Sequence, residues 1–97
     1  MVIIVESYVP WEGIAQVIEV NAKMPAIADF ITARGPYGTS ELGAGVKGIT
    51  LYEFDDARLK EATDAIAKRL MGYIGITDYT WEMKTYYSME EAVALMG

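Results

Sequence analysis

Five residues of this chain have the character and spacing of a small-molecule site. In the segment YTWEMKTYY, Tyr79, Trp81 and Met83 alternate along one face of an expected strand. Tyr52 belongs to the expected strand ITLYEF, and Asn21 interrupts the apolar stripe of an expected helix. Phenol and indole rings can enclose a flat apolar ligand while their polar tips orient it. These five residues therefore form the candidate ligand site.

The same residues also fit an ordinary hydrophobic core, and Ser7 is a further candidate beside them. Aromatic stripes most often pack beneath helices, so we favour core packing for the rings. Asn21 has two interpretations. Its amide could bind a substrate oxygen, or it could satisfy backbone groups freed by Pro25, and we favour the backbone role.

A second group of polar residues lies on the opposite strand faces and consists of Glu6, Glu53 and Glu82 with Lys84. Three carboxylates held close together raise one another's proton affinity and could act as a general base or bind a cation. The alternative is an ion-paired network at a dimer interface or barrel mouth, with Lys84 as the counter-charge. We favour the network, because such networks occur without catalysis, and we assign no metal site.

The composition excludes several classes of function. The chain has neither cysteine nor histidine, so it lacks a thiol nucleophile, an imidazole base, the usual zinc ligands and the usual haem ligand. We expect no cofactor. With 14 acidic and 8 basic side chains, the net charge of −6 opposes binding to nucleic acid. No apolar run approaches the roughly 20 residues of a membrane span, and the simplest location is the cytoplasm.

The first half of the chain predicts a strand, a helix and a short strand. Val2 to Val9 is rich in Val and Ile, which favours a strand. The apolar phase of residues 14–31 continues across Pro25, which predicts a kinked helix or two helices nearly in line. Arg34 and Gly35 are expected to end it. Residues 36–38 then form a turn, residues 39–42 a short strand, and the glycines at 43, 45 and 48 a hairpin connection or bulged edge.

The second half predicts a strand, a helix, a strand and a terminal helix. Asp55 and Asp56 are good N-cap residues for the helix after ITLYEF. Asp64 is expected to pair with Lys68 one turn away. The apolar stripe of this helix is Leu59, Ala62, Ile66, Leu70 and Tyr73. After the strand 79–87, Ser88 and Glu91 match a capping box.

The order β-α-β-β-α-β with a terminal helix predicts one α+β domain over residues 1–97. This is the ferredoxin-like plan, a four-stranded antiparallel sheet with the first and third strands in the centre. Two helices cover only one face of such a sheet, yet both faces of the central strands carry large apolar residues. We therefore expect a homodimer, or a higher homo-oligomer, packed sheet to sheet.

The element order resembles the dimeric α+β barrel superfamily. LYEFDD before a helix, followed by DYTWEMKTYYSMEEAVALM, is similar to the second half of a family of small uncharacterised barrel proteins. The resemblance implies a ligand site between sheet and helices. The expected function is a homodimeric barrel protein that binds a small apolar or aromatic molecule. The alternatives are a cofactor-independent monooxygenase-like enzyme and a purely structural oligomerisation module.

Overall fold

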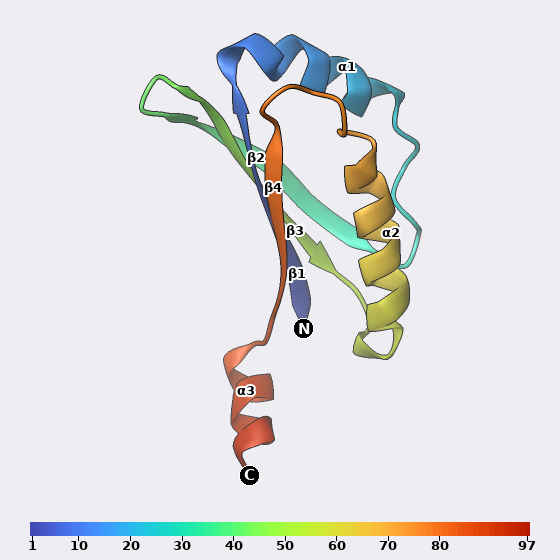
Figure 1. Ribbon diagram of the computed structural model, residues 1–97. Helices are drawn as coiled ribbons and strands as arrows, with labels where there is room; N and C mark the ends of the chain where they lie inside the picture. The colour runs from blue at the N-terminus through green and yellow to red at the C-terminus, as the bar shows by residue number, and fades with distance from the viewer.

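Strands and helices follow one another along the chain in the predicted order, β-α-β-β-α-β with a terminal helix (Figure 1). The computed structural model describes residues 1–97. Two single turns of 3-10 helix, Trp11–Gly13 and Asp56–Arg58, precede the first two α-helices. The main elements are β1 (Val2–Pro10), α1 (Ile14–Lys23), β2 (Thr32–Glu41), β3 (Gly45–Glu53), α2 (Leu59–Met71), β4 (Thr80–Tyr86) and α3 (Met89–Met96).

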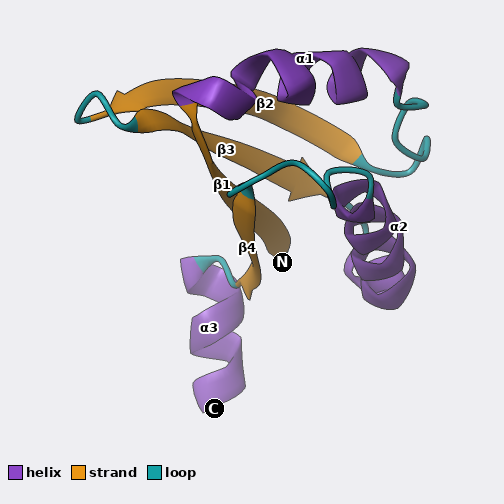
Figure 2. Cartoon of the chain, turned by 45° about the horizontal axis from the view of Figure 1, so that its top comes forward, coloured by secondary structure: helices purple, strands orange, loops and turns teal.

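All neighbouring strands are antiparallel, in the sheet order β2-β3-β1-β4. The prediction that the first and third strands occupy the centre is confirmed, as is the α+β class with a four-stranded antiparallel sheet. Figure 2 shows α1 and α2 on one side of this sheet and no helix over the other side. We call the uncovered side the open face. None of the helices combines the length and apolar character needed to cross a membrane.

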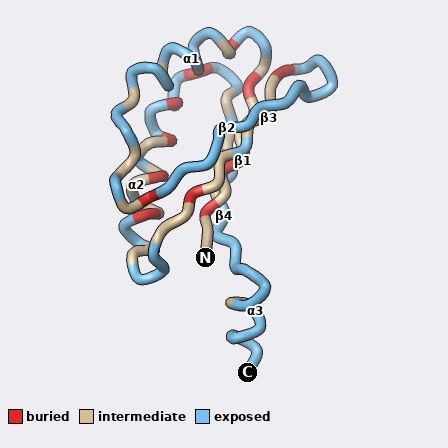
Figure 3. The backbone as a smooth tube through the Cα atoms, turned by 180° about the vertical axis from the view of Figure 1, so that it is seen from behind, coloured by how far each residue is buried: buried red, intermediate tan, exposed pale blue.

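The hydrophobic core lies between α2 and the covered side of the two central strands (Figure 3). Ile3 of β1 pairs with Tyr52 of β3, and both are buried against the helices. Ile66 of α2 is completely buried, which is worth about 1.5–3 kcal/mol for such a side chain. The buried core residues are Ile3, Val5, Val9, Ile31, Tyr52, Ala62, Ile66, Leu70, Tyr73 and Ile76.

The helix expected over residues 14–31 is shorter than predicted, because Pro25 ends it. A helical Pro25 would lack an N–H donor and crowd the carbonyl of Asn21. That carbonyl instead accepts a hydrogen bond from the Met24 N–H at 3.3 Å, and α1 stops at Lys23. Residues 24–31 form an irregular connection between α1 and β2.

The expected helix end at Arg34 and Gly35 and the expected turn at residues 36–38 are also wrong, since these residues belong to β2. Thr32 to Arg34 pair with the end of β3, and pairing resumes at Tyr37 after a register shift. Gly35, with φ of +101°, and Pro36, which has no N–H, lie within this bulge. The bulge tolerates the two residues that otherwise indicate a break.

β3 starts at Gly45, earlier than the ITLYEF pattern predicts. Gly45 faces Pro10 across the ladder, and a Cβ added there would lie 2.2 Å from the carbonyl oxygen of Val9. Only glycine permits this approach of two backbones. The expected hairpin connection is present, with its turn at residues 42–44.

The polar contacts of α2 confirm one expectation and correct another. Asp55 accepts a hydrogen bond from the N–H of Ala57 at 3.1 Å, as an N-cap residue should. Asp64, however, pairs with Lys60 at 2.9 Å and not with Lys68. Both lysines lie one turn from Asp64, and the carboxylate is turned toward Lys60. Lys68 has no carboxylate within 4.0 Å.

α3 projects beyond the rest of the molecule at the end of β4 (Figure 1). Its predicted capping box is confirmed, since Ser88 accepts from the Glu91 N–H and Glu91 accepts from the Ser88 N–H. The ammonium of Met1 also binds the Glu91 carboxylate. These hydrogen bonds lower the pKa of Glu91 to about 2. The large apolar side chains of this helix remain exposed, namely Met89, Val93, Leu95 and Met96.

Candidate functional site

A cavity of about 60 Å³ lies between the covered side of the sheet and the two helices. We call it the tyrosine cavity, because three tyrosines reach it, Tyr52 from β3 and Tyr73 and Tyr79 from the connection between α2 and β4. The lining residues are Val5, Ser7, Asn21, Pro36, Thr50, Tyr52, Arg69, Leu70, Tyr73 and Tyr79. Hydroxyl, amide and guanidinium groups from five separate segments therefore surround one small space.

The tyrosine rings are held by each other and by α1. Tyr73 donates a hydrogen bond from its hydroxyl to Oδ1 of Asn21 at 3.1 Å. The rings of Tyr73 and Tyr79 stack at 4.8 Å with 16° between their planes. Tyr79 also lies 6.0 Å from Trp81 at a tilt of 45°. Such stacked and tilted pairs favour a defined ring position.

Burial raises the pKa of all three tyrosine hydroxyls above the ordinary value. The Arg69 charge opposes this effect at Tyr52 and Tyr73, and a hydrogen bond with Ser7 opposes it at Tyr79. The net direction is upward in each case. At neutral pH the three hydroxyls are therefore uncharged and able to donate hydrogen bonds, beside a guanidinium that is always charged.

The structure brings three of the five candidate ligand residues together, namely Asn21, Tyr52 and Tyr79. Trp81 and Met83 do not line the cavity, and Trp81 lines a separate depression. Tyr52 belongs to the hydrophobic core, and Tyr79, Trp81 and Met83 all pack against it, so the favoured core interpretation fits all four residues.

Asn21 does not take the backbone role that we favoured for it. Its side-chain oxygen accepts from the Tyr73 hydroxyl. The carbonyl of Pro25 is satisfied by a different residue, since Nη1 of Arg69 donates to it at 2.6 Å. The longer reach of the arginine from α2 explains why the neighbouring helix, and not α1 itself, supplies the partner.

Two lining residues, Arg69 and Tyr73, were not expected in the site. Tyr73 was assigned to the core through the apolar stripe of α2, where it is indeed buried. Arg69 lies in the last turn of α2, four residues before Tyr73, which follows the helix end at Met71. In the sequence, the available sign of a site was an arginine four residues before a tyrosine that was expected to be buried. Only the position of α1 relative to α2 shows that these two residues line a cavity.

The glutamates and Lys84 lie on the open face, as predicted, but the carboxylates do not form one cluster. Glu6 and Glu82 are register partners across β1 and β4, whereas Glu53 pairs with Val2, four residues along β1 from Glu6. Lys84 neutralises Glu82 at 3.0 Å, and a separate cation, Arg34, binds Glu53. No group of three carboxylates is placed to hold a metal ion.

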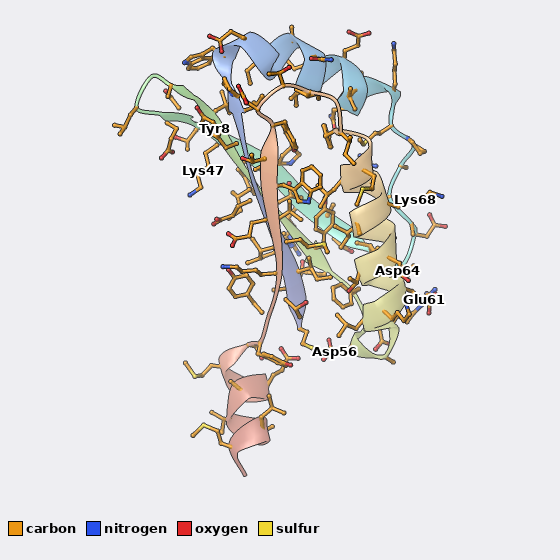
Figure 4. The ribbon with its side chains drawn as sticks, viewed as in Figure 1. Tyr8, Lys47, Asp56, Glu61, Asp64 and Lys68 are labelled. Carbon is orange, nitrogen blue, oxygen red and sulfur yellow. The ribbon has the colours of Figure 1, made fainter.

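A depression of about 340 Å³ on the open side is lined by Glu6 and Glu82 together with Tyr8 and Lys47. Figure 4 shows Tyr8 and Lys47 on the side of the molecule away from α2. Neither Glu6 nor Lys47 forms an ion pair within the chain, with 4.0 Å as the limiting distance. Glu41 lines the same depression and is also unpaired, so the open face presents two unpaired carboxylates and one unpaired ammonium.

Comparison with known proteins assigns no family to the chain, since no protein-family model and no curated protein matches it. Among solved structures, it is similar to "De novo designed protein Foldit4", with 9% sequence identity and a TM-score of 0.46. The match covers 89% of this chain and 97% of the designed chain. A likeness at this level carries no argument about function.

Proposed function

We propose that the protein is a homodimeric small-molecule-binding protein. In this proposal two copies pack their open faces together as a dimeric α+β barrel. Each copy holds a compact, oxygen-bearing molecule in its tyrosine cavity. The observation that carries the binding function is the convergence of three neutral tyrosine hydroxyls, Asn21 and Arg69 on one cavity.

The dimer is supported by how little of a single chain is buried. Only 12 of 97 residues are buried, and the radius of gyration is 14.8 Å. A compact domain of this length should reach about 12.5 Å. The open face includes Ile49 and Tyr86, which are 40% and 43% exposed. Exposed apolar patches of this kind mark interaction surfaces.

A second copy is the occupant that best fits the charges on this face. A twofold interface presents the same patch from both sides, so each patch must be complementary to itself. Lys47 and the free carboxylates Glu6 and Glu41 meet this condition in part, because the ammonium of one copy can face a free carboxylate of the other. One carboxylate in each copy is then left without a partner. In the single chain, by contrast, Glu6 directly faces Glu82, which is an unfavourable pairing of like charges.

Sedimentation velocity tests this part of the proposal. At micromolar concentration the protein should sediment as a dimer, and dilution should shift it toward a monomer. A strictly monomeric species over the whole range would reject the sheet-to-sheet dimer, while leaving the tyrosine cavity to be tested separately.

The volume of the tyrosine cavity limits the size of its ligand. An apolar cavity of about 150 Å³ accommodates benzene, whereas this cavity measures about 60 Å³. The polar lining would also leave hydroxyl groups unpaired against an apolar ligand, which is unfavourable. A compact molecule with a carbonyl or carboxylate oxygen fits both limits better than an intact aromatic ring does.

The same lining favours binding over catalysis. An oxygenase reaction that begins with removal of a substrate proton needs a base within hydrogen-bond reach of that proton. The raised pKa values keep the three tyrosines protonated at neutral pH, and no carboxylate lines the cavity. The groups present can donate hydrogen bonds to an oxygen atom but are poor proton acceptors.

Titration with small probes tests the binding function. We suggest acetamide, acetate and hydroquinone, followed by amide chemical shifts and by Trp81 fluorescence in a Trp11→Phe background. Acetamide or acetate should produce saturable changes at Ser7, Thr50 and Asn21. Tyr79→Phe should weaken them, and Tyr87→Phe, which alters an exposed ring outside the cavity, should not.

Three results would count against this assignment. Saturable shifts confined to other parts of the molecule would remove the tyrosine cavity as the site. Binding of hydroquinone alone would restore the aromatic ligand expected from the sequence. Oxygen uptake in the presence of hydroquinone would restore the oxygenase alternative.

A further inference from the structure

A second and larger cavity lies on the helix side of the molecule, between α2 and the connection that follows α1. We call it the cationic groove. Its volume of about 350 Å³ falls within the range of small-molecule sites. It is lined by Met24, Pro25, Ala26, Ile27, Ala28, Ala65, Lys68, Arg69 and Gly72.

The walls of the groove are mainly apolar, and glycine shapes one part of them. A Cβ added to Gly72 would lie 2.6 Å from the terminal methyl of Met24, so the methionine tip rests directly against α2 at this position. Ile27 and Ala65 add apolar surface from the connection and from the helix. The groove can therefore enclose a hydrocarbon chain or ring.

Two positive charges border this apolar space. Of the eight lysines and arginines, five pair with carboxylates, namely Lys23, Arg34, Arg58, Lys60 and Lys84. The three others have no carboxylate within 4.0 Å, and two of these three, Lys68 and Arg69, line the groove. Figure 4 shows Lys68 reaching outward from α2. In a chain with a net charge of −6, this local excess of positive charge is selective for anions.

We propose that the cationic groove binds a free monocarboxylate with an apolar body. The body lies against Met24, Ile27 and Ala65, and the carboxylate meets Lys68 and Arg69. A guanidinium matches the geometry of a carboxylate well. The peptide N–H groups of Ala26, Ile27 and Ala28 donate no hydrogen bond within the chain, which leaves further donors beside the same groove.

The two cations also have an ordinary structural role in α2, but that role does not explain why an apolar cavity lies beside them. Lys68 and Arg69 lie in the last turn of α2, where cations stabilise the helix dipole. That effect needs no apolar space beside the charges. The groove also lies on the helix side, away from the open face, so it remains accessible in the proposed dimer. This inference and the proposed function can therefore fail independently.

Isothermal titration with decanoate, decanol, 1-naphthoate and phosphatidylserine vesicles tests the inference on the full chain. We expect saturable binding of decanoate and binding of decanol that is about tenfold weaker, since decanol lacks the charge. Comparison of 1-naphthoate with decanoate shows whether the groove prefers an aromatic or an aliphatic ligand. Binding of either acid supports the proposal. Binding to vesicles without binding to a free acid overturns it in favour of a membrane surface.

Three variants make the test specific. Ala65→Leu fills the groove while it leaves both cations in place, and should abolish binding of decanoate. Lys68→Gln should weaken binding about two- to fivefold, as expected for an exposed ion pair. Lys84→Gln removes a cation on β4, outside the groove and not next to Asp64, and should leave the affinity unchanged. Equal losses in the two lysine variants, or full affinity in Ala65→Leu, would overturn the proposal.

Discussion

Tyr73 and Asn21, which are 52 residues apart in the chain, are joined by a hydrogen bond of 3.1 Å from the tyrosine hydroxyl to Oδ1. The bond connects the end of α2 to α1, a helix with no buried residue of its own. Arg69 adds a second connection through the carbonyl of Pro25. The position of α1 over the sheet, and with it the shape of both cavities, therefore depends on polar contacts as well as on apolar packing.

The tyrosines of the cavity should ionise late in an alkaline titration. Burial raises the pKa values of Tyr52, Tyr73 and Tyr79 above the ordinary value of 10.0. The absorbance of tyrosinate should therefore show three residues that titrate above this value in the folded protein. Tyr52→Phe should reduce the number of tyrosines that titrate above pH 10 from three to two, whereas Tyr87→Phe should leave this number at three. If three tyrosines still titrate above pH 10 in Tyr52→Phe, Tyr52 is not one of the tyrosines with a raised pKa.

The same shifts make a prediction for stability at high pH. A group whose folded pKa lies above its unfolded value contributes stability that is complete below the unfolded pKa and is lost as the pH rises through the folded pKa. For these three tyrosines the loss begins near pH 10. The urea midpoint should fall above that pH, and the fall should be smaller in Tyr52→Phe than in the parent chain.

The open face should be sensitive to a single added charge. Ile49 is the register partner of Glu6, so Ile49→Glu places a second carboxylate beside an unpaired one. We expect this variant to be monomeric in sedimentation velocity under conditions in which the parent chain is dimeric. Ile18→Glu provides the control, because Ile18 is 63% exposed on α1. If the Ile49→Glu variant is still dimeric, the dimer interface does not lie on the open face.

Ile66 should be among the most sensitive positions of the core. It is completely buried, so Ile66→Ala should lower the free energy of unfolding by about 2–5 kcal/mol and Ile66→Val by about 0.5–1.5 kcal/mol. Urea denaturation at constant protein concentration measures both changes. Ile74, which is 65% exposed, offers the matched Ile→Val control, and its effect should stay within about 0.5 kcal/mol.

α3 should depend strongly on its cap. A helix of eight residues is marginal on its own in water. Removing the Ser88 hydroxyl should therefore destabilise it by about 1 kcal/mol. In Ser88→Ala, carbon chemical shifts of residues 89–96 should move toward random-coil values, and Ser40→Ala should have no such effect. Retention of full helicity would indicate that packing against another surface holds α3.

Most of the fold follows from local patterns in the sequence. The Val- and Ile-rich run of β1, the alternation of β4, the apolar stripe of α2 and the two caps at Asp55 and Ser88 each depend on residues that are neighbours in the chain. The strand order follows from the element order and the handedness of crossovers. These features needed no knowledge of contacts between distant segments.

The errors occur where tertiary pairing overrides a local signal. Residues 32–38 carry glycine and proline, which indicate a break, yet pairing with β3 holds them in a bulged strand. The apolar phase across Pro25 predicted more helix than proline allows. Asp64 had two lysines within one turn, and sequence alone does not choose between them.

The candidate site was predictable only in part, because a cavity is a relation between segments. Tyr52 and Tyr79 could be placed on the covered side from strand alternation. Tyr73 looked like an ordinary core residue, and the only signal for Arg69 was its spacing of four residues from that tyrosine. Their role depends on α1 ending at Lys23, which lets the following connection approach α2.

Arg69 lines both the tyrosine cavity and the cationic groove, so the two spaces share one wall. Pro25 lines the groove as well, so the hydrogen bond from Arg69 to its carbonyl holds the guanidinium at the groove. A ligand that moves the guanidinium changes the shape of both spaces. If each space binds a ligand, thermodynamic reciprocity requires that each ligand change the affinity of the protein for the other ligand by the same factor. A single arginine would then couple two chemically different ligands, one apolar and acidic, the other compact and polar.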